Sequence, residues 1–246
     1  PKSSAQRWAF TSREPIGVVA SVSAFNQPVN LIIHQTVTAI AAGCPVIIKP
    51  ALTTPLSCLA FVDILEEAGL PSGWCQAIVC DNDAAELLVI DKRVNYFSFI
   101  GSAKVGWYLR SKLAPGTRCA LEHGGAAPVI VEKDADIEEM MPALAKGGFY
   151  HAGQVCVSVQ RVFAHEDISE KVSSNLSELA KKLVVGDPLD EKTEVGPLIL
   201  SKEVDRVSQW VDEAITLGAK LLCGGKKISD TCYAPTVLLN PPVDAK

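Results

Sequence analysis

In the first half of the chain, short apolar runs alternate with longer segments typical of helices. The runs predict five strands, at residues 16–22, 45–48, 75–79, 96–100 and 118–121. Helices are predicted between and after them, at residues 28–43, 55–68, 84–90 and from 102 to about 113, several with proline at the start or glycine at the end. Apolar strands that alternate with helices indicate a parallel sheet covered on both faces, which is an α/β fold.

The second half of the chain has a different pattern of predicted elements. Residues 128–131 and 157–164 predict strands, with a helix at 137–150 between them, and a last strand is expected just before Pro241. Two further helices are predicted where apolar residues recur at helical spacing, at Ile168, Val172, Leu176, Leu179 and Leu183, and again at Val204, Val207, Val211 and Ala214. This change predicts a domain boundary near Gly124, with one domain over residues 1–124 and another over 125–246.

The composition indicates the broad class of protein but does not indicate a function. A hydrophobic fraction of 48%, a charged fraction of 21% and a net charge of −5 are typical of a soluble globular protein. We expect no nucleic-acid partner, since no basic stretch carries interleaved aromatics, and no membrane span, since no apolar run reaches roughly 18 residues. The eight cysteines stand singly, without CxxC pairs, and no secretory leader is evident. We therefore expect reduced thiols in the cytoplasm, and neither a disulfide framework nor a metal site.

Polar or turn residues follow four of the predicted strands. Asn26, Lys49, the pair Gly101–Ser102, and Glu122 each stand at or just after the end of a different strand. In doubly wound sheets the ligand binds outside the carboxyl ends of the strands, so these residues are expected to line one rim.

Each of these rim residues also has a simpler interpretation. In the segment FIGSAKVG, a strand-to-helix turn at Gly101–Ser102 could bind phosphate, or Ser102 could be only an N-cap. Lys49 could donate to a ribose or phosphate, or could extend into solvent from the strand end. Asn26 could donate to an oxyanion, or could cap the following helix.

Two side chains carry candidate covalent chemistry. Cys156 lies in FYHAGQVC, where the flanking Gly153 and Gln154 are expected to leave room for a substrate, and an attacking thiol is a strong nucleophile. Glu122 lies in LEHGG, where an apolar strand and two glycines are expected to leave the carboxylate poorly solvated, and so a better base. The alternatives are an inert cysteine and a glutamate with a structural partner.

Taken together, these segments resemble the aldehyde dehydrogenase superfamily, from about Pro15 to Pro235. The segments that carry the resemblance are PIGVVASVSAFNQP, AIAAGCPVIIKPALTTP, FIGSAKVG, LEHGGAAP, FYHAGQVC, VVGDPLDEKTEVGPLI and YAPTVL. The resemblance implies a Rossmann-like NAD(P)-binding domain with a parallel sheet, followed by part of an α/β catalytic domain that carries the nucleophile.

The resemblance also implies a role for each site residue. Cys156 attacks a small aldehyde, and the side chain of Asn26 and the backbone N–H of Cys156 hold the oxyanion. Hydride passes to the nicotinamide, which leaves a thioester, and Glu122 then activates water. The residues implied to bind NAD or NADP are Lys49, Gly101, Ser102, Phe25, Gly124 and Leu52.

Departures from the family pattern qualify these implications. Leu52 stands where many relatives have a Glu that binds the adenine ribose, so the choice between NAD and NADP stays open. Glu122 is retained, and this favours hydrolysis to a carboxylic acid over transfer to coenzyme A. Gln35 replaces a common Lys and so weakens a proton relay there. His123 and His151 replace an apolar residue and an amide, and either favours an anionic substrate or makes structural hydrogen bonds.

The family extends beyond both ends of this sequence, so we expect a fragment that is inactive or barely active alone. The resemblance implies a homodimer or homotetramer for the parent, and the aldehyde is not identified. Two alternatives stay open: a cysteine hydrolase or acyltransferase that uses Cys156 without nicotinamide, and a non-catalytic binding protein of the same fold.

Overall fold

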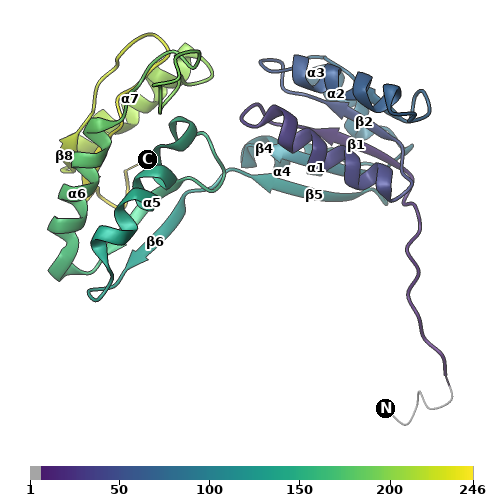
Figure 1. Cartoon of the computed structure of the whole chain (residues 1–246). Helices are drawn as coiled ribbons and strands as arrows, with labels where there is room; N and C mark the ends of the chain where they lie inside the picture. Colours follow the sequence, from purple (N-terminus) through teal and green to yellow (C-terminus); the bar gives the residue numbers. More distant parts are fainter. Residues whose placement is uncertain (1–6, 246) are drawn as a thin grey trace. The chain divides into compact units, whose positions relative to one another are not determined.

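The structure of the protein, a computed structural model, describes residues 7–245. The chain divides into two compact units, the first ending at His123 and the second beginning at Gly124 (Figure 1). Within the described residues, no helix is both long enough and apolar enough to cross a membrane.

The first unit is built on a parallel sheet of five strands with the order β3-β2-β1-β4-β5. Its elements are β1 (Val18–Val22), α1 (Pro28–Ala41), β2 (Val46–Lys49), α2 (Leu56–Glu67), β3 (Cys75–Ala77), α3 (Asn82–Ile90), β4 (Val94–Gly101), α4 (Ala103–Lys112) and β5 (Arg118–His123). The predicted α/β fold with a parallel sheet is confirmed. All five predicted strands and four predicted helices are present, with ends displaced by up to two residues.

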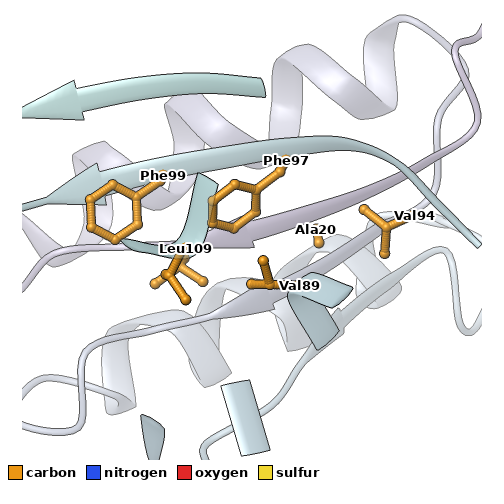
Figure 2. Packing of buried hydrophobic residues seen from close by; sticks show 7 residues of the cluster. Ala20, Val89, Val94, Phe97, Phe99 and Leu109 are labelled. Carbon is orange, nitrogen blue, oxygen red and sulfur yellow. The ribbon is translucent and has the colours of Figure 1, made fainter. Parts of the chain in front are cut away.

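One face of this sheet packs against α3 and α4. Ala20 of β1 and Phe97 and Phe99 of β4 meet Val89 of α3 and Leu109 of α4 in one apolar cluster (Figure 2). Phe97 is fully buried, and burial of one such ring contributes about 1.5–3 kcal/mol.

The opposite face packs against α1 and α2. Ile32 of α1 and Cys58 of α2 are buried against Ile48 and Cys75 of the sheet. Since consecutive strand residues point to opposite faces, Val19 of β1 joins this side while its neighbour Ala20 does not. Burial on both faces explains why these strands read as continuous apolar runs.

The second unit is more divided. A parallel pair, β6 (Ala127–Val131) and β7 (Val159–Ala164), packs against α5 (Ile137–Phe149) and α6 (Ser169–Lys182). Short 3₁₀ segments, η2 (Tyr150–Gly153) and η3 (Glu166–Ile168), follow α5 and β7. The remaining elements are α7 (Ser201–Thr216) and an antiparallel pair, β8 (Lys220–Cys223) and β9 (Val237–Leu239). The strand predicted to start at residue 157 starts at Val159, because residues 155–158 form a turn. Strand β8 was not predicted from the sequence.

Candidate functional site

The strand order of the first unit reverses at β1, which pairs with β2 on one side and β4 on the other. Asn26 follows β1, and Ser102 follows β4, so both stand at the carboxyl ends of the two strands that flank this switch point. Ligands of open α/β sheets bind at such a point. The N-cap position of α1 is Gln27, so the interpretation of Asn26 as the cap of this helix is wrong.

Lys49 is the last residue of β2 and lies beside Val22 at the end of β1. Its side chain is largely buried, with 6% of the residue exposed. A lysine whose stem packs within the unit, with its ammonium group at a strand end, is suited to donate to an incoming polar ligand.

The turn between β4 and α4 is shaped around the ring of Phe99. A Cβ on Gly101 would lie 2.7 Å from Cζ of Phe99, and one on Gly106 would lie 2.9 Å from Cε1 of the same ring. Ser102 occupies the N-cap position, but its hydroxyl makes no capping hydrogen bond. The first-turn N–H groups of α4 are therefore not satisfied by this side chain and are available to an anion.

His123 packs among aromatic rings at the end of β5. Its ring lies edge-on to Trp107, with centroids 5.3 Å apart, and to Phe99, with centroids 6.1 Å apart. A Cβ on Gly106 would collide with its Nε2. His123 is therefore packed among rings, and its buried Nε2 has no hydrogen-bond partner within the part of the chain that the structure describes, so the expected structural hydrogen bond is absent at that atom.

Glu122 lies on β5, an edge strand, where it pairs with Ile100. Along β5 the exposure alternates, so Cys119 and Leu121 pack against the core while Glu122 is exposed on the other face. The expectation of a poorly solvated carboxylate is therefore wrong for this chain. The two glycines after Glu122 are visible in the sequence. The position of β5 at the edge of the sheet, with one face exposed to solvent, is not.

Cys156 is exposed in a turn between η2 and β7. The structure describes all eight cysteines as free thiols; five are buried and two are partly buried. Burial, with a smaller effect of nearby Cys75, raises the pKa of Cys58 to about 11, and burial also raises the pKa of Cys75. Since the thiolate is the reactive form, these buried thiols are poor nucleophiles.

Two contacts hold the backbone around Cys156. A Cβ on Gly125 would lie 2.5 Å from the carbonyl oxygen of Cys156, so the two backbones approach as closely as only glycine permits. Ser158 is buried, and its hydroxyl lies 3.3 Å from the carbonyl oxygens of Gly147 and Gly148 at the end of α5. The turn is therefore packed against the segment just before β6 and bonded to the end of α5.

Gln154 does not simply leave room for a substrate, as its position beside Gly153 suggested. Its amide nitrogen donates to the carbonyl oxygens of His151 and Pro197, both at 3.2 Å, and its Oε1 accepts from the N–H of Ile199 at 2.9 Å. The bonds to Pro197 and Ile199 could not be predicted from the local sequence, because each joins residues more than 40 positions apart.

The remaining candidate residues stand in irregular segments. Phe25 is half-buried in the bend after β1, and Leu52 is exposed in the turn after β2. Gly124 has open space where a side chain would point. Within the described residues, no three potential metal ligands gather in one place.

The two adjacent glycines give a matched test of the packing at Cys156. We expect Gly125→Ala to lower the free energy of unfolding by about 1–3 kcal/mol, because its methyl group must displace the backbone of Cys156. Gly124→Ala is the control and should change it by less than about 1 kcal/mol, since neither glycine has a positive φ and nothing obstructs the added methyl group. Urea unfolding of both variants measures the difference. Equal effects of the two substitutions would contradict the close contact.

Comparison with known proteins identifies the family. The family model "Aldehyde dehydrogenase family" matches residues 1–246, and the chain belongs to this family. This confirms the resemblance read from the sequence motifs.

Individual relatives agree with the family model. The chain is 44% identical over 244 residues to a 3-sulfolactaldehyde dehydrogenase of Priestia megaterium, covering 99% of the chain and 51% of the relative. It is 41% identical over 237 residues to a lactaldehyde dehydrogenase of Methanocaldococcus jannaschii, covering 94% and 51%. The NADP complex of glyceraldehyde-3-phosphate dehydrogenase GapN from the latter organism superposes with a TM-score of 0.88 at 40% identity, covering 92% and 50%. The chain therefore spans about half the length of these relatives.

Proposed function

We propose that the natural polypeptide containing this sequence oxidises an aldehyde to a carboxylic acid with NAD or NADP. The observation that carries the proposal is Cys156, the one exposed thiol among the described cysteines, on a turn held at several points. Membership of the aldehyde dehydrogenase family supports the same reaction.

The roles proposed for the protein's own residues follow from their chemistry. The Cys156 thiolate attacks the aldehyde carbon, which forms a C–S bond and an alkoxide. The side-chain amide of Asn26 and the backbone N–H of Cys156 donate to this oxygen, and loss of one such donor typically slows a reaction about 10²–10³-fold. Loss of hydride from the carbon leaves a thioester on Cys156. Glu122 takes a proton from water, which attacks the thioester and releases the acid and the thiol.

The first unit has features that fit a dinucleotide. The ammonium of the largely buried Lys49 and the uncapped first turn of α4 at Gly101–Ser102 suit ribose and phosphate oxygens. Phe25, Gly124 and Leu52 complete the proposed binding residues. When bound, the nicotinamide supplies the acceptor for the hydride that leaves the aldehyde carbon.

Leu52 bears on the choice between the two nicotinamides. It is 53% exposed and offers no carboxylate to the adenine ribose. Absence of that charge forgoes about 1.5–3 kcal/mol of charge-assisted hydrogen bonding with NAD, but it also removes repulsion of a 2′-phosphate. The relative solved with NADP supports the possibility of NADP use.

Steady-state kinetics with both nicotinamides tests the proposal. We expect formation of reduced nicotinamide that depends on an aldehyde, and a panel should begin with small hydroxylated and anionic aldehydes, because the relatives are named for such substrates. The protein at its natural length is assayed beside the 246-residue chain. Aldehyde or ester turnover without any reduced nicotinamide would instead favour a cysteine hydrolase or acyltransferase.

A further inference from the structure

The segment VGPLI, at residues 195–199, carries no role in the proposed chemistry, yet the side chain of Gln154 bonds to it at both ends of its amide. Nε2 donates to the carbonyl oxygen of Pro197, and Oε1 accepts from the N–H of Ile199. One side chain thus pairs with two backbone groups two residues apart, as a neighbouring strand would. We propose that Gln154 is a positioning residue that fixes the Cys156 turn to residues 195–199.

Segment η2, which leads into Gln154 and the Cys156 turn, needs such a restraint because its backbone is strained. His151 and Ala152 have φ values of 55° and 54°, and Gly153 follows with 74°. Two consecutive side-chain-bearing residues in the left-handed region are unfavourable and persist only where surrounding contacts enforce them. The backbone N–H of Gln154 donates to the carbonyl oxygen of His151 in η2 at 3.1 Å. The side-chain amide of Gln154 also donates to that carbonyl, so η2 and the bridge share one acceptor.

Residues 195–199, to which Gln154 bonds, are themselves held in place by burial and by a hydrogen bond. Val195 and Leu198 are buried, and the N–H of Leu198 donates to the carbonyl oxygen of Thr231 at 2.8 Å. Leu198 belongs to an apolar cluster with Val204, Val211 and Tyr233, against which Ala152 also packs. The turn is therefore held to this segment by a polar bridge and by an apolar contact.

The consequence for chemistry rests on the proposed function. Cys156 lies two residues beyond Gln154, and its backbone N–H is the proposed oxyanion donor. The Gln154 bridge therefore orients that N–H without touching the substrate. The identity of the amide matters, because one end must donate and the other must accept.

Amide hydrogen exchange of the 246-residue chain tests the bridge without requiring turnover. Gln154→Met removes the bonds to Pro197 and Ile199, and the side-chain bond to His151, at nearly constant volume. We expect the backbone amide at position 154 to exchange about tenfold faster, which is the effect of losing one to two ordinary hydrogen bonds. The amide of Leu198 should keep its protection, because its partner is Thr231. Gln160→Met, at an exposed position on β7, is the matched control and should change neither amide.

Gln154→Glu separates a bridging role from a purely steric one. The ionised carboxylate can accept from Ile199 but repels the carbonyl oxygen of Pro197, whereas the protonated acid has one donor and one acceptor, like the amide. We expect protection at position 154 to be low at neutral pH and to return toward the wild-type value as pH falls through the carboxyl pKa. The wild type in the same pH series is the control for other effects of pH on exchange.

Unchanged protection in Gln154→Met, or an absence of pH-dependent recovery in Gln154→Glu, would overturn the proposal. Both variants report on the turn alone. A protein that fails to oxidise aldehydes but shows these exchange changes would refute the proposed function and leave the bridge intact.

Discussion

Cys156→Ser should lower the rate of aldehyde oxidation at least about 10³-fold, because a hydroxyl is a far weaker nucleophile than a thiolate at neutral pH. The substitution removes little packing, since Cys156 is exposed, so the free energy of unfolding should change by less than about 0.5 kcal/mol. The measurement is kcat/KM at saturating nicotinamide, in protein of natural length, with urea unfolding as the check on folding.

Cys80→Ser is the matched control for this prediction. Cys80 is partly buried, so a reagent or substrate reaches it less readily than Cys156. The Cys80→Ser variant should retain the wild-type rate of aldehyde oxidation. Retention of the rate within about tenfold by the Cys156 variant would remove the thiol from the mechanism.

Glu122→Gln should separate the two halves of the reaction. Hydride transfer needs no base in the acyl-forming step once the thiolate is present, so the first turnover should still yield about one equivalent of reduced nicotinamide per site. Hydrolysis of the thioester should then slow by about 10²–10⁴-fold, the usual contribution of a general base. Stopped-flow absorbance distinguishes the burst from the slow steady rate.

The control for the base is Glu132→Gln, which removes an equally exposed carboxylate just after β6. It should turn over like the wild type. A Glu122 variant that loses the burst and the steady rate together would place the carboxylate in an earlier step, and one that turns over normally would exclude it as the base.

Much of the fold could be predicted because its strands are buried on both faces. Continuous apolar runs mark such strands, and the glycines and prolines at helix ends mark their limits. Strand β8 was not predicted because it is a short, half-exposed segment. It forms a strand only by pairing with β9, and this pairing cannot be read from local composition.

The candidate site shows where sequence reasoning is limited. The positions of Asn26 and Ser102 at strand ends follow from the alternation of elements, and the structure places both beside the switch point of the sheet. The solvation of Glu122 was wrongly predicted because it depends on β5 being an edge. The bonds from Gln154 to Pro197 and Ile199 were not predicted. They join distant segments, and the partners are backbone atoms, which every residue has, so no residue type in the sequence marks them.

In the proposed reaction, Cys156 carries one acyl group, which Glu122 helps to release. Peptide mass spectrometry can detect this intermediate in Glu122→Gln protein that is quenched in acid during the burst with an aldehyde and nicotinamide. We expect the added mass of the acyl group on the peptide containing Cys156, and its absence when nicotinamide is omitted. An unmodified Cys156 at the end of the burst, or an acyl group on another residue, would contradict the proposed reaction.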